Sequence, residues 1–148
     1  MDFLKNRSKL GGIKFEKLIS EGAVIDCRKY REITADAIKN ADIKNKIVLF
    51  YTGHSKKSKS EYIKKWPVLS EDLARLLVKS SVKTVGVDTL SPDNEPYNVH
   101  RILLDKEIPI IENLVNLDQL IGKKFQAVIL PLKLDLDGAP CRAIALIE

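Results

Sequence analysis

Ile47-Val-Leu-Phe-Tyr-Thr52 is the stretch that decides the fold. The residues from Ile47 to Tyr51 are apolar or aromatic without interruption, and most of them favour strands. A short continuous run of this kind is typical of a strand that is buried on both faces. Gly53 follows directly and ends the strand. The run therefore predicts a central strand covered by other elements on each side.

Outward from this strand, further strands alternate with short helices. The other predicted strands are Ala23 to Cys27, Val82 to Asp88, Ile108 to Glu112, Phe125 to Leu132 and Arg142 to Ile147. Thr34 and Ser70 precede predicted helices, since their hydroxyls can accept a hydrogen bond from a free backbone N–H. The first helix is predicted over Ala35 to Ala41, and the second carries Leu73, Leu76 and Leu77 at helical spacing. The third helix is predicted over Val99 to Lys106. A single helical turn is predicted at Leu117 to Ile121 and ends at Gly122. About six or seven strands with three or four short helices predict an α/β domain.

Length and composition place the chain among globular proteins. Its 148 residues, 45% of them hydrophobic, suit one domain over residues 1–148 that buries roughly two-thirds of its unfolded surface. The composition excludes a disordered or collagen-like chain. No apolar run is long enough to span a membrane, and residues 1–7 contain no apolar signal segment. We expect a cytoplasmic protein without a membrane partner.

The charge balance is mildly basic, with 25 Lys and Arg against 20 Asp and Glu, a formal net charge of +5. Lysines are densest between His54 and Lys65. Only Tyr62 and Trp66 offer stacking surfaces nearby, and no nucleic-acid-binding motif surrounds them. A solvated loop accounts for this segment, so we expect no nucleic-acid partner.

The two cysteines, Cys27 and Cys141, do not form a Cys-x-x-Cys pair. Both lie in apolar stretches that resemble strands. We expect buried, reduced thiols, with a disulfide or a catalytic pair as the alternative.

His100 and Glu112 are the best candidates for a chemical site. The chain has two histidines and no Ser/His/Asp order, phosphate loop or dinucleotide fingerprint. From His100 the predicted helix runs away over about five residues of ~1.5 Å each, and the strand from Pro109 to Glu112 returns over about three steps of ~3.3 Å. The imidazole and the carboxylate can therefore end at the same level, a combination that suits Zn²⁺ or Mn²⁺. A structural hydrogen bond between the two residues, or no contact at all, is the alternative at this point.

Several short segments follow one another in a characteristic order. They are Ile47-Val-Leu-Phe-Tyr-Thr-Gly53, Trp66-Pro-Val-Leu-Ser70, Val85-Gly-Val-Asp-Thr89, His100-Arg-Ile-Leu-Leu104, Ile108-Pro-Ile-Ile-Glu-Asn-Leu114, Leu117-Asp-Gln-Leu120 and Leu130-Pro-Leu132. Together, from about Gly11 to the end, they resemble the putative cyclase family, which includes bacterial kynurenine formamidase. The resemblance implies a swivelling β/β/α fold, with a mixed sheet and short helices in one domain, usually assembled as dimers or tetramers. It also implies a metal-dependent amide hydrolase, typically one that cleaves N-formylkynurenine in tryptophan breakdown.

The resemblance carries over to two metal ligands and departs at the N-terminus. In that family a histidine before Leu-Leu and a glutamate before Asn-Leu help to hold a metal pair, and these positions match His100 and Glu112. The family's signature, His-x-Gly-Thr-His-x-Asp-x-Pro-x-His, is missing from this sequence. Compared with the family the chain is truncated at its N-terminus, and Asp2 stands near the place of the last histidine. His54 lies in another segment and does not replace it, and Tyr51 stands where the family has Arg.

Two protein ligands fall short of the three that usually hold a catalytic zinc. Zn²⁺ or Mn²⁺ binding is therefore expected to be weak or absent in this chain as given, and no catalytic residue is identified. Two functions remain open. One is an arylformamidase-like, metal-dependent hydrolase of N-formylkynurenine or a related small amide, whose missing ligands come from upstream residues or a neighbouring subunit. The alternative is a catalytically inactive homologue with an oligomeric structural or binding role. Both predict a homo-oligomer.

Overall fold

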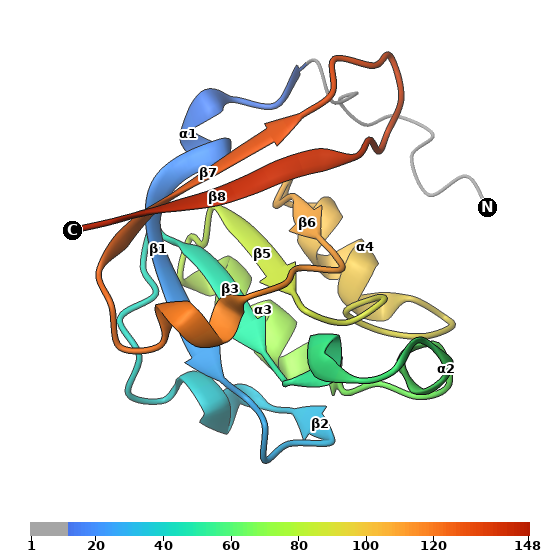
Figure 1. The fold of residues 1–148 in the computed structure, drawn as a ribbon. Helices are drawn as coiled ribbons and strands as arrows, with labels where there is room; N and C mark the ends of the chain where they lie inside the picture. The colour runs from blue at the N-terminus through green and yellow to red at the C-terminus, as the bar shows by residue number, and fades with distance from the viewer. Residues whose placement is uncertain (1–11) are drawn as a thin grey trace.

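The structure is a computed structural model that describes residues 12–148 (Figure 1). Six strands form one sheet in the order β6-β5-β3-β1-β7-β8, and β2 and β4 form a small second pair. The strands are β1 (Ile19–Asp26), β2 (Glu32–Ile33), β3 (Ile47–Tyr51), β4 (Val68–Leu69), β5 (Thr84–Val87), β6 (Ile110–Ile111), β7 (Phe125–Pro131) and β8 (Cys141–Ile147). The helices are α1 (Phe15–Leu18), α2 (Lys59–Tyr62), α3 (Glu71–Lys79) and α4 (Asn98–Leu104), with 3₁₀ turns η2 (Ala35–Ile38), η3 (His54–Lys56) and η4 (Leu117–Leu120).

The sheet is mixed. Strands β1, β3, β5 and β6 run parallel, whereas β7 is antiparallel to β1 and β8 is antiparallel to β7. All five residues of β3 are buried, as the apolar run predicts. A strand with both faces covered needs no polar alternation, which explains why it is the clearest strand signal in the sequence.

Two apolar clusters cover the two faces of the parallel strands. Helices α3 and α4 pack on one face, behind the sheet in Figure 1, around fully buried side chains such as Leu73, Leu77 and Leu103. The second cluster lies on the other face, where Leu49, Leu117 and Phe125 come together. The β7–β8 ribbon crosses in front of this face in Figure 1. One face is thus closed by helices and the other by a ribbon and a loop.

The two predicted N-caps have different outcomes. Ser70 caps α3 as predicted, because its hydroxyl accepts a hydrogen bond from the Leu73 N–H. Thr34 makes no such bond, and the helix predicted over Ala35 to Ala41 is a 3₁₀ turn that ends at Ile38. Ile38 is its only buried residue. With no apolar stripe to pack, the segment does not extend into an amphipathic α-helix.

The prediction for the cysteines is half confirmed. Both thiols are free, and Cys27 is buried. Burial raises the pKa of the Cys27 thiol to about 12, with the charges of Asp26 and Asp88 adding to the effect, so this thiol stays protonated. Cys141 is exposed, contrary to prediction, because β8 is the last strand of the sheet.

Other boundaries differ in detail. Strand β1 begins at Ile19, four positions before the predicted start, and β6 contains only Ile110 and Ile111. Within residues 12–148, no helix has the length and apolar character needed to cross a membrane.

Candidate metal and substrate site

The parallel strands carry polar residues to one edge of the sheet. Asp26 ends β1, Thr52 follows β3, Asp88 follows β5 and Glu112 follows β6. Because these strands are parallel and adjacent, the four side chains lie along their common carboxyl edge. In open α/β sheets this edge is where ligands bind.

The structure brings His100 and Glu112 together. His100 lies in the first turn of α4, and Glu112 directly follows β6. The His100 Nε2 and Glu112 Oε1 atoms are 3.6 Å apart. The side chains are 20% and 34% exposed, so both are partly accessible to solvent. The predicted convergence of these residues is confirmed; their role as metal ligands stays a prediction.

Asp93 is the functional neighbour that the sequence reasoning missed. Its Oδ1 atom lies 2.5 Å from His100 Nδ1, and its Oδ2 atom accepts the N–H groups of Val99 and His100 at 2.8 and 3.2 Å. One carboxylate therefore caps α4 and fixes the imidazole ring on the same helix. The hydrogen bond between His100 Nδ1 and Asp93 orients the ring so that Nε2 faces Glu112. The only sequence signal was an acidic residue in the loop before the helix.

The two carboxylates change the protonation of His100. Burial, the largest single influence, favours the neutral imidazole. The hydrogen bonds to Asp93 and Glu112 and their negative charges act in the opposite direction, and together they raise the pKa of His100 to about 9. Without a bound cation, His100 is therefore an imidazolium held between two carboxylates at neutral pH.

Asp88 stabilises the same edge from within. It is fully buried, and its Oδ1 atom accepts hydrogen bonds from the Thr52 N–H at 2.9 Å and the Thr52 hydroxyl at 2.6 Å. Its Oδ2 atom accepts the Ser55 hydroxyl at 3.2 Å. These bonds satisfy the carboxylate without a cation and tie the end of β5 to the turn after β3.

His54 is a structural histidine. It is 1% exposed, and its Nε2–H group donates a hydrogen bond to the Tyr62 carbonyl oxygen at 2.8 Å. This bond holds η3 against α2 and leaves His54 outside the His100–Glu112 pair, as expected. Asp2, the other residue compared with the family's signature, lies outside the described residues.

Tyr51 is buried, and a positive charge stands over its ring. The Arg28 guanidinium lies 5.6 Å from the ring centroid and forms a two-atom ion pair with Asp26, with distances of 2.9 and 2.7 Å. The Arg28 guanidinium, from the loop after β1, thus places a positive charge beside Tyr51, the position at which the family has Arg.

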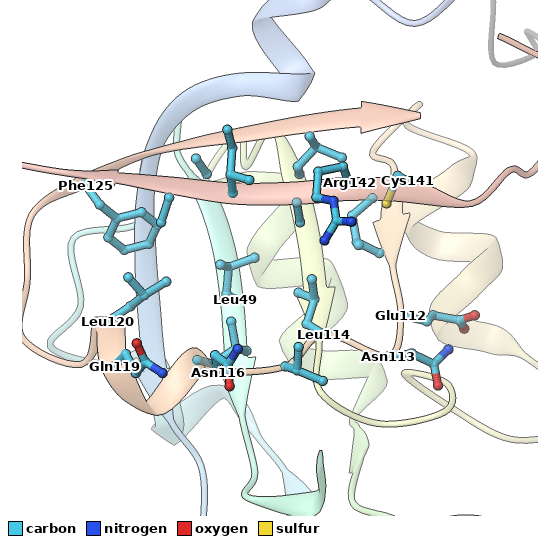
Figure 2. Close-up of a pocket in the computed structure, with 18 of the residues that line it drawn as sticks. Leu49, Glu112, Asn113, Leu114, Asn116, Gln119, Leu120, Phe125, Cys141 and Arg142 are labelled. Carbon is cyan, nitrogen blue, oxygen red and sulfur yellow. The ribbon is translucent and has the colours of Figure 1, made fainter. Parts of the chain in front are cut away.

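A cavity of about 410 Å³ adjoins this edge. It lies between β7–β8 and the segment from Glu112 to Leu120, with an apolar floor that includes Leu49 and Phe125. Figure 2 shows Glu112 and Arg142 at one end of the cavity and Phe125 at the other. The Glu112 carboxylate points away from the cavity, toward the side where His100 lies.

A complete metal site is not present in the part of the chain that the structure describes. Residues 12–148 contain no group of three or more His, Cys, Asp or Glu side chains arranged to hold a metal ion. His100 and Glu112 offer one nitrogen and one carboxylate, a donor pair that suits a transition metal but does not complete its coordination.

Comparison with known proteins gives related sequences. An uncharacterized protein of Methanocaldococcus jannaschii is 41% identical over 106 residues, which cover 68% of this chain and 54% of that protein. Kynurenine formamidase of Bacillus cytotoxicus is 37% identical over 82 residues, which cover 53% of this chain and 39% of that enzyme. The chain thus spans about half the length, or less, of the curated relatives it matches.

The fold is also found among solved structures. A potential metal-dependent hydrolase with cyclase activity superposes with a TM-score of 0.86 at 27% identity, over 97% of this chain and 72% of that protein. This likeness confirms the predicted α/β cyclase-like fold, with its mixed sheet and short helices. The sequence model of the family described as putative cyclase matches residues 1–94. The chain therefore belongs to the putative cyclase family.

Proposed function

We propose that this chain belongs to a metal-dependent amide hydrolase that acts on N-formylkynurenine or a related small amide. The observation that carries the proposal is the His100–Glu112 pair, whose nitrogen and oxygen atoms face each other at 3.6 Å beside a cavity. The similarity to a kynurenine formamidase supports the choice of substrate class. An activity of this kind would place the protein in tryptophan breakdown.

The residues present fit part of a metal site. Asp93 fixes His100 through Nδ1 and leaves Nε2 toward Glu112, an arrangement in which a carboxylate orients a metal-binding histidine. His100 and Glu112 would therefore hold a Zn²⁺ or Mn²⁺ ion. A metal bound there would polarise the substrate carbonyl and acidify a water molecule.

The chain's own residues provide binding and orientation. A cavity of about 410 Å³ lies within the size range of small-molecule sites, and its apolar floor suits an aromatic or aliphatic group. Glu112 belongs both to the pair with His100 and to the cavity wall. Because the Glu112 carboxylate points away from the cavity, a substrate whose apolar group fills the cavity must extend past Glu112 to bring its amide to the pair. Further ligands must come from outside residues 12–148 or from a second subunit, because a catalytic zinc usually has three protein ligands.

The experiment measures metal content and hydrolysis separately. Purified protein is equilibrated with Zn²⁺ or Mn²⁺, and bound metal is measured by inductively coupled plasma mass spectrometry. His100→Ala and Glu112→Gln are expected to lose the bound metal and keep a native circular dichroism spectrum. Glu16→Gln, which changes an exposed carboxylate of α1, is the control and is expected to keep it. Unchanged metal content in both site variants would show that the ligand assignment is wrong.

A second candidate is a catalytically inactive homologue with a structural or binding role. The absence of a three-ligand group within residues 12–148 favours it. Kynurenine release from N-formylkynurenine in the presence of added metal distinguishes the two. Metal binding without hydrolysis, in wild-type protein that is fully folded, would support the inactive homologue.

A further inference from the structure

Asn113 lies where the His100–Glu112 pair adjoins the cavity. It directly follows Glu112 in the chain and lines the cavity. Its backbone is left-handed, with a φ of 59°, a conformation that asparagine adopts more readily than most residues. Its N–H donates a hydrogen bond to the Thr89 carbonyl oxygen at 2.9 Å, which fixes the main chain against the segment after β5. A ligand that extends from the cavity past Glu112 therefore comes beside the Asn113 side chain.

A tyrosine hydroxyl orients this side chain. The Tyr62 hydroxyl donates a hydrogen bond to Asn113 Oδ1 at 2.7 Å, whereas its other acceptor, the Asp88 carbonyl oxygen, is 3.5 Å away. The amide oxygen is thus turned toward Tyr62, and Figure 2 shows the amide nitrogen on the side of Glu112. The reverse orientation would place the amide oxygen beside the Glu112 carboxylate, which would repel it. Both neighbours therefore favour the same orientation of the amide.

Tyr62 is itself held in place by a buried histidine. The His54 Nε2–H group donates to the Tyr62 carbonyl oxygen at 2.8 Å, and the two ring centroids are 4.9 Å apart. Because His54 is almost fully buried, the end of α2 is anchored to the body of the molecule. His54 lies outside the His100–Glu112 pair and nevertheless supports the hydroxyl that orients Asn113.

The Nδ2 group of Asn113 is a donor that remains available to a ligand. No acceptor among residues 12–148 forms a hydrogen bond with it. A side-chain amide nitrogen has two hydrogens to donate. A fixed donor of this kind binds a carbonyl oxygen, and it binds more strongly when negative charge develops on that oxygen during acyl transfer.

We propose that Asn113 binds the carbonyl oxygen of the substrate amide through Nδ2, and that Tyr62 is the positioning residue that orients it. The inference rests on the proposed function for the identity of the substrate. Asn113 acts only by donating a hydrogen bond, so no covalent bond to it forms and no proton leaves it. Tyr62 does not contact the substrate and acts through the amide of Asn113.

Binding to metal-free protein tests the contact separately from hydrolysis. Protein labelled with ¹⁵N is titrated with N-formyl-L-kynurenine, and the asparagine side-chain resonances are followed by NMR. The Asn113 pair is assigned by its loss in Asn113→Gly, a substitution that tolerates the left-handed backbone. An Nδ2 proton of Asn113 is expected to shift downfield on binding. The dissociation constant of Asn113→Gly should be about threefold to tenfold higher, the usual effect of one lost hydrogen bond.

Asn45→Gly is the matched control. Asn45 has the same left-handed backbone, with a φ of 58°, and lies before β3, at the opposite end of the parallel strands from Glu112. Its resonances and the dissociation constant of its variant should not change. An Asn113 amide that stays unshifted up to millimolar probe, or equal affinities of Asn113→Gly and wild type, would overturn the proposal.

A double substitution tests the role of Tyr62. Tyr62→Phe keeps the ring beside His54 and removes only the hydroxyl, so the amide of Asn113 becomes free to turn. The dissociation constant is expected to rise about threefold. In the Asn113→Gly background the same substitution should have no further effect, because the hydroxyl acts only through that amide. Additive effects would show that Tyr62 supports the fold in general and does not position Asn113.

Kinetics of the metal-loaded protein test the effect on the reaction. Asn113→Gly is expected to lower kcat about tenfold or more and to change KM less, because the hydrogen bond strengthens as charge develops on the oxygen. A change confined to KM would overturn this part of the proposal. If wild-type protein hydrolyses nothing, the proposed function fails, while the NMR titration still decides whether Asn113 binds the carbonyl oxygen.

Discussion

A single imidazole between two carboxylates sets the chemistry at the scale of the residue. Asp93 holds Nδ1 of His100 at 2.5 Å, and Glu112 faces Nε2 at 3.6 Å. With its pKa raised to about 9, His100 carries a proton at neutral pH that a metal ion must displace. Proton and metal therefore compete for the same nitrogen, and metal affinity should increase with pH.

The first prediction concerns this titration. In metal-free protein the ring resonances of His100 are expected to titrate with a midpoint near pH 9, instead of the usual value near 6.5. Asp93→Asn removes one negative neighbour and should lower the midpoint, which NMR can follow directly. A wild-type midpoint near 6.5 would contradict the carboxylate clamp.

The same shift predicts how stability depends on pH. The folded pKa of His100 is above the unfolded one, so the stabilisation is complete below about pH 6.5 and is lost as the pH rises through about 9. Compared with His100→Gln, the wild-type advantage in free energy of unfolding should decrease over this window by roughly 2 to 3 kcal/mol at most. Urea unfolding at several pH values measures it. A constant difference between the two proteins would show that His100 gains nothing from its charge.

At the scale of the element, the close packing of β1 against β7 requires a glycine, which has no side chain. Gly22 lies in β1 directly under the ring of Phe125, in β7, and a Cβ atom at position 22 would overlap several ring atoms. Phe125 is only 2% exposed, and its ring can move only toward the cavity that it lines. The contact of ring and backbone sets how closely β1 and β7 meet.

The second stability prediction follows from this contact. Gly22→Ala is expected to lower the free energy of unfolding by about 1 to 3 kcal/mol, the usual cost of overpacking a core. Gly138→Ala is the matched control, because a Cβ atom there meets nothing within 4 Å and the change should stay within about 0.5 kcal/mol. Chemical denaturation of both variants tests the difference. Equal effects would mean that Phe125 adjusts freely.

The elements differ in how far the sequence could predict them. The strand from Ile47 to Tyr51 was clear because complete burial produces an uninterrupted apolar run. The Ser70 cap was clear because capping is a local interaction. By contrast β2 and β4 pair over only two residues each, too few to produce a periodic pattern.

The candidate site shows the same division. The meeting of His100 and Glu112 follows from the lengths of one helix and one strand, which local geometry fixes. Asp93 could not be placed this way, because its contact depends on the path of an irregular loop. The exposure of Cys141 depends on the order of strands in the sheet, which short-range patterns do not contain.

At the scale of the whole molecule, the two faces of the sheet are closed to different degrees. On one face α3 and α4 pack against a continuous core. On the other, the cavity of about 410 Å³ interrupts the packing between the β7–β8 ribbon and the loop at η4. A side chain beside that cavity has fewer neighbours to lose and more room for relaxation.

The last prediction compares one leucine from each face. Leu77, a residue of α3, is fully buried, and Leu117, 3% exposed, lines the cavity, so burial alone predicts equal costs for truncation. Leu→Ala substitutions in cores cost about 2 to 5 kcal/mol, depending on how far the surroundings can collapse. We expect Leu77→Ala near the upper end of this range and Leu117→Ala near the lower end. Urea unfolding at one fixed protein concentration, which keeps any contribution from dimers constant, measures both. Equal losses would mean that the cavity is filled in solution, and that another part of the chain or a second molecule packs against Leu117.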